Sequence, residues 1–489
     1  MKTRINLVLL AIFIATFMTS VEVTIVTTAL PTIVSEFHGV SQLTWVFSMY
    51  LLTTAVAAPI FGKLSDQIGR KPIFIIGLII FVVGSALCGI ATNMLLLIIF
   101  RAVQGIGAGA ITPIIFTIIA DVFSVEKRAN VMALNNMAWG ISAMIGPLLG
   151  GFIVDNLSWH WIFFINVPLG GIVLLLVSIG YFESDRVKSK KLAIDYKGIT
   201  AFAVVLISLL LGLQGLGERQ LNVPIILLCF IVFIVAFILF IKVEKSTEMP
   251  LVLFNLFSSH TFTVQIATIM LLMCIQIGFA IYFPIWLQSI YQVSASAAGL
   301  ALTPSSIMWV LASFSVAIIM KNFAPRNTVM TIVLIQMLFY LTLVFAGVNF
   351  YQFMFYIISG VTFGIITSTN TIVAQAVVSR EYVGTASSMV TLGRTLGQTL
   401  MVGIYGLIFN LTLNQNIKKH DGLSMELFDK VINSKTAPNV GSLRPVIDTT
   451  LLSAFHNIYL LVVTLFVAVL VINYFDPMQK PLVAKNDKK

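Results

Sequence analysis

The sequence is poor in charged residues. Charged side chains make up 10% of the 489 residues, whereas 58% are hydrophobic, and the mean hydropathy is +1.01. A soluble domain carries about 25% charged residues. A water-soluble fold with this composition would expose large apolar patches and aggregate. The composition therefore excludes a soluble protein and predicts an all-α or β-barrel integral membrane protein.

The sequence also has few cysteines and lacks the common motifs of soluble enzymes. Cys88, Cys229 and Cys274 each lie inside an apolar run, and no CxxC pair occurs. We interpret them as inert buried thiols. No GxxxxGK[ST] loop, zinc-type His/Cys cluster or nucleophile elbow is present. We therefore expect neither an enzyme nor a self-contained ATP-driven pump, and no metal or cofactor other than a proton gradient.

Long apolar runs occupy most of the chain. A spanning helix needs about 20 mostly apolar residues, and continuous runs favour helices over the short alternating strands of a barrel. Fourteen runs qualify, at about 6–33, 41–61, 72–92, 94–121, 129–153, 161–182, 198–217, 222–242, 261–290, 296–320, 327–348, 350–379, 384–410 and 451–475. The sequence thus predicts an all-α integral membrane protein with 14 transmembrane helices.

The net charge is +10, because 29 Lys and Arg residues outnumber 19 Asp and Glu residues. The basic residues lie mainly in short loops between the apolar runs. Most of these residues fall in the segments that are cytoplasmic if the N-terminus is inside. The positive-inside rule then places both termini in the cytoplasm of a multi-pass plasma-membrane protein. We interpret the basic residues as orientation signals and contacts with anionic lipid in the bilayer, and we expect no nucleic-acid partner.

A weak internal repeat appears at an offset of 255 residues, where Gly62 corresponds to Ala317, Lys71 to Arg326, Gly105 to Gly360 and Gly109 to Gly364. Secondary transporters commonly arise from duplicated halves. The repeat predicts two six-helix bundles with two inserted helices. The expected divisions are the N-terminal bundle at 1–183, a cytoplasmic linker at 184–197, the inserted helices at 198–243, a second cytoplasmic linker at 244–260, the C-terminal bundle at 261–476 with a long outer loop at 411–450, and a tail at 477–489.

Glu22 is the one acidic residue that falls deep inside an expected span. A carboxylate in lipid is costly, so it must face the protein interior or water, where it can hold a proton in one state and attract a cation in another. Arg101 and Gln104 share a helix face at helical spacing. We interpret Arg101 as a cavity-facing cation that tunes Glu22 or a proton path, or else as a structural partner for backbone carbonyls. Arg394 is a second candidate for the proton or substrate path.

The segment from Gly62 to Lys71 has the composition of a tight charged turn between two spans. Gly62 and Gly69 permit close turns. Asp66 and Arg70 are one helical turn apart and can pair with each other or brace other helix ends. Asp121 is a candidate partner for Arg70. We expect this cluster, with Lys71, to act as a gate at the cytoplasmic face.

These motifs resemble the major facilitator superfamily. The turn is similar to its pattern G-x-L-[SA]-D-x-x-G-R-[KR], and the run from Arg101 to Gly109 is similar to R-x-x-Q-G-x-G-x-[AG]. Residues 21–31 resemble the L-D-x-T-I-V-N-x-A-L-P signature of the fourteen-helix drug/proton antiporter branch, with Glu22 where that branch has Asp. The antiporter motif of the drug exporters is matched by Gly146, Pro147, Gly150 and Gly151, although two upstream glycines are replaced by Ala133 and Ser142.

The resemblance implies two bundles that rock around a central cavity. It implies a proton-coupled antiporter that exports small amphipathic or cationic compounds such as drugs, dyes and antiseptics, and that functions as a monomer. The alternative is a proton-coupled transporter of a lipid, peptide or metabolite on the same fold. Soft apolar and amide side chains suit varied ligands. The candidates for lining the cavity are Met18, Gln265, Gln276, Tyr282, Trp286, Trp309 and Gln375, each of which has packing or lipid contact as its alternative.

Overall fold

The computed structural model describes residues 3–37, 43–183, 196–216, 222–247, 250, 253–291, 303–345, 351–420, 423–424, 427–428 and 443–482. Most of the linker expected at 184–197, part of the loop expected at 411–450 and the end of the tail expected at 477–489 lie outside these residues. Within them the chain is helical and contains no strand, which confirms the all-α class and excludes the barrel for the described chain.

The N-terminal half consists of α1 (Ile5–Phe37), α2 (Leu43–Ile68), α3 (Arg70–Gly89), α4 (Met94–Val122), α5 (Val125–Asn156), α6 (Trp161–Phe164) and α7 (Asn166–Gly180). The sixth expected span is divided between α6 and α7. α8 (Tyr196–Leu216) and α9 (Val223–Ser246) follow, and then the short α10 (Phe254–Phe257).

The C-terminal half consists of α11 (His260–Tyr291), α13 (Thr303–Asn322), α14 (Pro325–Phe345), α15 (Tyr351–Ala376), the 3-10 turn η2 (Arg380–Tyr382), α16 (Val383–Ile417) and α18 (Arg444–Tyr474). The outer loop is shorter than the expected 411–450, because residues 411–417 belong to α16 and residues 444–450 belong to α18.

Each expected span overlaps one of these helices, or the α6–α7 pair. Eleven helices in the described chain are long and apolar enough to cross a membrane. α5 and α15 are not among them, and the apolar part of α8 is shorter, at Lys197–Leu213. The protein is therefore a multi-pass membrane protein, and the count of fourteen spans stays a prediction.

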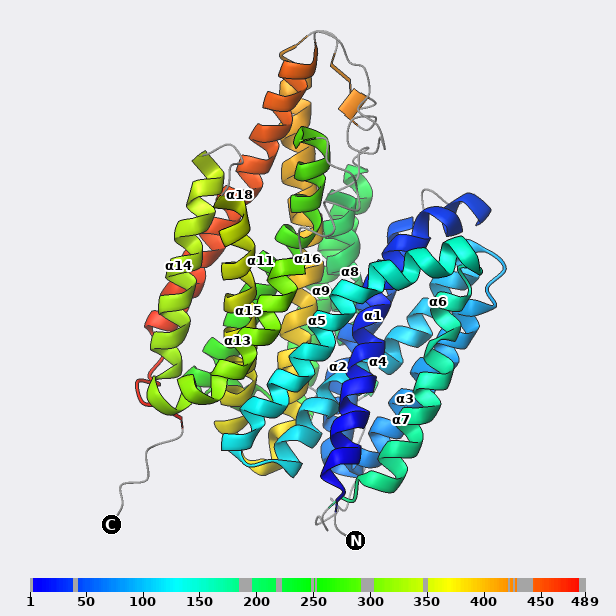
Figure 1. Cartoon of the computed structure of the whole chain (residues 1–489), viewed down its shortest axis with the longest axis vertical. Helices are drawn as coiled ribbons and strands as arrows, with labels where there is room; N and C mark the ends of the chain where they lie inside the picture. Colours follow the sequence, from blue (N-terminus) through cyan, green and yellow to red (C-terminus); the bar gives the residue numbers. More distant parts are fainter. Residues whose placement is uncertain are drawn as a thin grey trace.

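The two halves form two bundles that lie side by side (Figure 1). α1 begins and α18 ends at one end of the molecule, which we call the terminal face (Figure 1). The positive charge pattern predicts that this face is cytoplasmic. The bundles pack against each other through α2 with α16 and α5 with α13.

The packing of glycines confirms the internal repeat. A Cβ on Gly105 would lie 2.4 Å from the carbonyl oxygen of Tyr50, and a Cβ on Gly360 would lie 2.1 Å from that of Ser305. Tyr50 and Ser305 are themselves 255 residues apart, as are Gly105 and Gly360. Each glycine thus lets two helices of one bundle touch at the backbone, α4 with α2 and α15 with α13.

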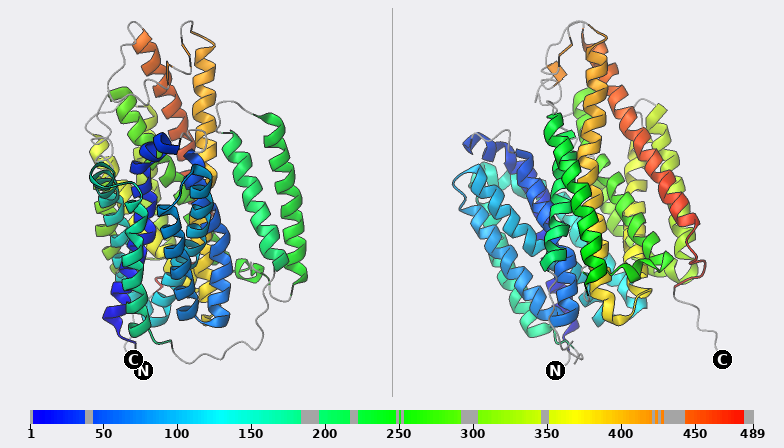
Figure 2. Two further views of the ribbon diagram at one scale, coloured as in Figure 1. Left: turned by 90° about the vertical axis from the view of Figure 1, so that its right-hand side faces the viewer. Right: turned by 180° about the vertical axis from the view of Figure 1, so that it is seen from behind.

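α8 and α9 form a hairpin beside the bundles (Figure 2, left). They pack on each other, and α8 also contacts α2 of the N-terminal bundle and α16 of the C-terminal bundle. A Cβ on Gly403 would lie 2.3 Å from the carbonyl oxygen of Leu213, so α8 approaches α16 closely. The hairpin therefore lies outside the two bundles and covers one line along which they meet.

Candidate functional site

Glu22 and Arg101 form an ion pair inside the N-terminal bundle. Arg101 Nη1 on α4 lies 2.5 Å from Glu22 Oε1 on α1, and both side chains are 0% exposed. Asn166, at the start of α7, donates a hydrogen bond of 2.8 Å to the other carboxylate oxygen of Glu22. Since a buried carboxylate needs such partners to offset its desolvation, Glu22 faces the protein interior and not the lipid.

Arg101 has further partners that enclose it. Its Nε donates to the carbonyl oxygen of Val46 at 3.1 Å, and its Cζ lies 4.3 Å from the ring centroid of Tyr50. Arg101 Nη1 also donates to Gln104 Oε1 at 2.7 Å. In this conformation neighbouring helices surround the guanidinium of Arg101, and its position facing a cavity stays a prediction. Its expected contact with Glu22 is present, and so is the alternative contact with a backbone carbonyl.

Asp66 joins the two bundles at the terminal face. It lies near the end of α2 and accepts hydrogen bonds from the backbone nitrogens of Gly384 (3.1 Å) and Thr385 (2.8 Å) at the start of α16. The Thr385 hydroxyl donates a third, at 2.9 Å. The first amides of a helix have no partner within it and carry the positive end of the helix dipole. Asp66 therefore caps a helix of the opposite bundle, one of the two arrangements that the sequence left open.

The remaining charged residues of the turn brace the N-terminal bundle. Arg70 pairs with Asp121 at the end of α4, as the sequence predicted. Lys71 Nζ donates to the carbonyl oxygens of Ser178 (2.8 Å) and Tyr181 (2.7 Å), at the end of α7. These contacts fix the ends of α3, α4 and α7 to one another, so this end of the N-terminal bundle is a rigid unit.

Gly69 is the residue that makes the turn possible. Its φ is +117°, a backbone conformation that residues other than glycine rarely adopt. Glu183 lies against this turn and accepts hydrogen bonds from the backbone nitrogen of Arg70 at 3.0 and 3.1 Å. Gly62 serves a different purpose, because its Cβ would lie 2.4 Å from Ser388 Cβ of α16. The two glycines thus support the turn and the contact between bundles, respectively.

Two buried amides add contacts between the bundles. Asn136 on α5 donates from Nδ2 to the hydroxyls of Ser313 (2.8 Å) and Ser368 (2.7 Å), on α13 and α15. Gln375 on α15 donates to the carbonyl oxygen of Phe116 on α4 at 3.0 Å. Together with Asp66, these contacts hold the bundles together in the half of the molecule nearer the terminal face.

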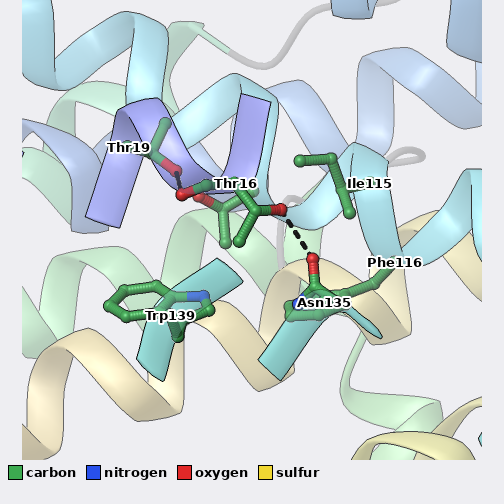
Figure 3. Close-up of a pocket in the computed structure, with 7 residues that line it drawn as sticks. Thr16, Thr19, Ile115, Phe116, Asn135 and Trp139 are labelled. Carbon is green, nitrogen blue, oxygen red and sulfur yellow. Dashed lines mark hydrogen bonds between the residues drawn. The ribbon is translucent and has the colours of Figure 1, made fainter. Parts of the chain in front are cut away.

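A small recess lies in the N-terminal bundle between α1, α4 and α5 (Figure 3), and in this conformation it is too narrow to hold a molecule. Its lining combines two large aromatic rings with hydroxyl and amide groups and has no charged side chain. The lining residues are Thr16, Thr19, Thr112, Ile115, Phe116, Asn135 and Trp139. The Thr16 hydroxyl donates a hydrogen bond of 2.6 Å to Asn135 Oδ1 across the recess wall. Such a mixture of aromatic and uncharged polar groups suits an amphipathic molecule.

Arg394 lies next to this recess, at the boundary between the bundles. Its Cζ is 5.2 Å from the ring centroid of Phe116, which also lines the recess. Its Nη2 donates to the hydroxyl of Thr371 at 3.1 Å and approaches the carbonyl oxygen of Thr367 at 3.4 Å. Arg394, unlike Arg101, has no carboxylate partner in the part of the chain that the structure describes.

The antiporter-motif residues differ in their surroundings. A Cβ on Gly146 would lie 2.1 Å from Thr24 Oγ1, so α5 approaches α1 closely at this point. Gly150 is buried, whereas Gly151 has nothing within 4 Å of the position of a Cβ. The side chain of Pro147 lies outside the described side chains. The expected helix contact is therefore present at Gly146 and absent at Gly151.

None of the residues expected to line a cavity belongs to the recess. Met18 and Trp286 are 0% exposed within the cores of the N- and C-terminal bundles. Tyr282 packs against Tyr405, with ring centroids 5.9 Å apart, and Trp309 lies beside Phe363. Packing, the alternative named for each of them, describes these four residues in this conformation.

The three glutamines expected in the cavity take part in polar contacts between helices. Gln265 Nε2 donates to Asp476 Oδ2 at 3.0 Å, next to the end of α18. Gln276 Oε1 accepts from Gln398 Nε2 at 3.1 Å. Gln375 joins the bundles, as described above. In this conformation each amide is used to hold helices together.

Several important residues were missed from the sequence. Asn135 and Asn136 are adjacent amides inside an otherwise apolar run, and Asn166 follows five consecutive apolar residues. A polar side chain within a span needs a partner in the protein. That signal, applied to amides as well as to charged groups, would have identified the recess, the contact between bundles and the partner of Glu22.

Comparison with known proteins identifies the family of the chain and agrees with the two-bundle membrane fold. Residues 12–402 match the Major Facilitator Superfamily. The chain belongs to this superfamily. Its fold and family make it a membrane transporter and not an enzyme.

The superfamily member is similar to two proteins of Bacillus subtilis (strain 168). It is 37% identical over 405 residues to "Multidrug resistance protein 3", covering 82% of this chain and 79% of that protein. It is 32% identical over 413 residues to "Multidrug transporter protein MdtP", covering 84% of this chain and 76% of that protein. Among solved structures, a bacterial homolog of the human lysosomal transporter Spinster, in an inward-facing and occupied conformation, superposes with a TM-score of 0.58 at 17% identity, over 98% of each chain. That likeness concerns the fold alone.

Proposed function

We propose that this transporter exports small amphipathic compounds, including drugs, dyes and antiseptics, in exchange for protons. The observation that carries the proposal is the buried Glu22–Arg101 pair, with Asn166 on the second carboxylate oxygen. Two relatives named as multidrug proteins support the class of cargo. The charge pattern of the loops supports an orientation with both termini in the cytoplasm, and the names of the relatives support export.

The exchange depends on how Glu22 is held. In this conformation the carboxylate is paired and 0% exposed, so it has no water to exchange a proton with. Protonation would remove the charge that Arg101 binds and would free Arg101 Nη1 from its 2.5 Å contact. We propose that a second conformation hydrates Glu22, and that the proton it takes up or releases there is the one exchanged for cargo.

The change of conformation would act through the contacts between the bundles. Asp66, Asn136 and Gln375 hold the terminal face closed. Opening that face breaks charge-assisted and amide hydrogen bonds, each of which must be replaced by water or cargo. We propose that the bundles rock about this boundary, and that this movement widens the recess of α1, α4 and α5 so that it takes the cargo.

Reconstituted protein tests the proposal directly. Proteoliposomes loaded with a pH-sensitive dye would be given a panel of amphipathic dyes and antibiotics, with and without a proton uncoupler. Exchange predicts that added substrate drives protons in the opposite direction to substrate and that the uncoupler abolishes substrate accumulation. Proton movement in the same direction as substrate would indicate a symporter of a lipid, peptide or metabolite. Substrate accumulation that is unaffected by the uncoupler would overturn the proposal.

A further inference from the structure

We propose that the cargo carries a negatively charged group, such as a carboxylate or sulfonate, and that Arg394 binds it. This inference rests on the proposed function, since it names the chemical class that the exporter moves. One relationship carries it. The ring of Phe116 lines the recess and also lies under the guanidinium of Arg394, with Cζ 5.2 Å from the ring centroid.

Arg394 has hydrogen-bonding capacity to spare. Its described hydrogen bonds run from Nη2 to the neutral oxygens of Thr371 and Thr367. Its Nε is buried and has no hydrogen-bond partner among the described atoms, while the residue as a whole is partly exposed. A guanidinium is charged at all physiological pH values and presents a planar fork that matches carboxylate or sulfonate oxygens. Arg394 can therefore receive an anionic group without breaking an existing ion pair.

The balance of charge within the spans favours the same conclusion. Glu22 is the one acidic residue deep inside a span, and Arg101 already neutralises it. Arg394 lies well inside α16 and has no carboxylate partner in the part of the chain that the structure describes. An unpaired cation at this depth is costly, and an anion that enters beside it offsets that cost. A lipophilic cation would instead add a second positive charge.

The lining of the recess suits the rest of such a molecule. Trp139 and Phe116 offer aromatic surface for an apolar body, and Ile115 extends it. No lining residue is acidic, so the recess has no carboxylate that would pair with a cation. Within the amphipathic or cationic cargo that the family resemblance implies, we therefore propose an aromatic or aliphatic acid with its charge toward Arg394.

Two probes that share a ring system and differ in charge make the test specific. Binding of 2-naphthalenesulfonate and of (2-naphthyl)trimethylammonium to the purified full-length protein would be measured by isothermal calorimetry. We expect wild type to bind the sulfonate at least about tenfold more tightly, a factor that corresponds to about 1.4 kcal/mol. Arg394→Gln should bring the ratio of the two affinities to about one, whereas Arg394→Lys should keep the sulfonate preferred.

Arg380→Gln is the matched control. Arg380 is exposed in the turn just before α16, so its loss removes the same charge from the same region without touching the recess. We expect its affinity ratio to equal that of wild type. An equal loss of preference in Arg380→Gln would overturn the assignment to Arg394. Tighter binding of the ammonium probe than of the sulfonate by wild type would overturn the inference itself. This comparison uses wild-type protein alone and does not depend on whether any variant folds.

A transport measurement separates this inference from the proposed function. In proteoliposomes with a proton gradient, uphill movement of the ammonium probe with none of the sulfonate would overturn the inference and leave proton-coupled export standing. If the gradient drives no amphipathic compound at all, the exporter proposal fails. In that case the affinity ratio and its loss in Arg394→Gln still decide whether Arg394 is an anion site.

Discussion

Asp66 and Thr385 belong to different bundles, and Asp66 Oδ2 accepts hydrogen bonds from both the backbone nitrogen (2.8 Å) and the hydroxyl (2.9 Å) of Thr385. The same carboxylate accepts from the backbone nitrogen of Gly384 through Oδ1. One side chain of α2 therefore caps α16 across the boundary. Opening the terminal face must break the hydrogen bonds from Gly384 and Thr385 to Asp66, so a substitution at Asp66 tests whether this contact keeps the face closed.

Asp66→Asn should favour the open terminal face and slow turnover more than it weakens cargo binding. The substitution removes a negative charge from a helix N-terminus and replaces one acceptor oxygen with a donor, which together cost about 1–3 kcal/mol. Transport rate and equilibrium binding would be measured on the same reconstituted sample. Asp448→Asn is the control, because Asp448 pairs with Arg444 within one helix, away from this contact. A normal transport rate in Asp66→Asn would remove the gate assignment.

Asn136→Ala should have a related effect at the contact of α5 with α13 and α15. It removes two hydrogen bonds, to Ser313 and Ser368, while the Ser313 hydroxyl keeps its hydrogen bond to the carbonyl oxygen of Trp309 in its own helix. At about 0.5–1.5 kcal/mol for each bond, the ratio of closed to open form should fall by roughly a factor of 5–150. Spin labels on α5 and α13 would report the distance between bundles. Asn156→Ala, at the exposed end of α5, is the control. Identical distance distributions in wild type and Asn136→Ala would contradict this role.

Gly105→Ala should destabilise the N-terminal bundle, since the new methyl group would lie 2.4 Å from the carbonyl oxygen of Tyr50 and 2.1 Å from Thr53 Oγ1. Overpacking of this kind costs about 1–3 kcal/mol. The thermal midpoint of the protein in detergent would show the loss as a lower melting temperature. Gly151→Ala is the matched control, because nothing lies within 4 Å of its Cβ position. Equal melting temperatures for the two variants would mean that the close contact of α4 with α2 is not as tight as described.

The fold was largely predictable because lipid imposes simple rules. A span must be long, apolar and helical, so the apolar runs located the helices. The match between Gly105 and Gly360 was predictable because a duplicated bundle needs small residues at equivalent crossings. The ends of α16 and α18 were not, since helices that continue beyond the membrane lose their apolar signal there. The bounds of the outer loop shifted for that reason.

The site was predictable where charge is involved and not elsewhere. Glu22 and Arg101 stand out because a charge inside a span requires a partner. Met18, Trp286 and Gln265 carry no such requirement, and their residue type does not say which helix face points to a cavity. A helix that is apolar all round has no periodicity to reveal its inner side. The contacts in the structure were needed to identify the recess between α1, α4 and α5, whose lining includes none of these cavity candidates.

The central claim concerns the proton on Glu22. Removing only one member of a buried ion pair leaves the other charge without a partner, so Glu22→Gln needs a variant that keeps the charge. Glu22→Asp serves this purpose, since it restores the carboxylate with one methylene fewer. Size-exclusion profiles and binding of a fluorescent substrate would establish that both variants are folded before transport is compared.

The decisive measurement is the number of protons moved per substrate in proteoliposomes that contain wild type, Glu22→Asp or Glu22→Gln. We predict proton movement coupled to substrate in wild type, its retention in Glu22→Asp and its loss in Glu22→Gln, which should still bind substrate. Glu22→Gln protein that moves as many protons per substrate as wild type would contradict the exchange mechanism.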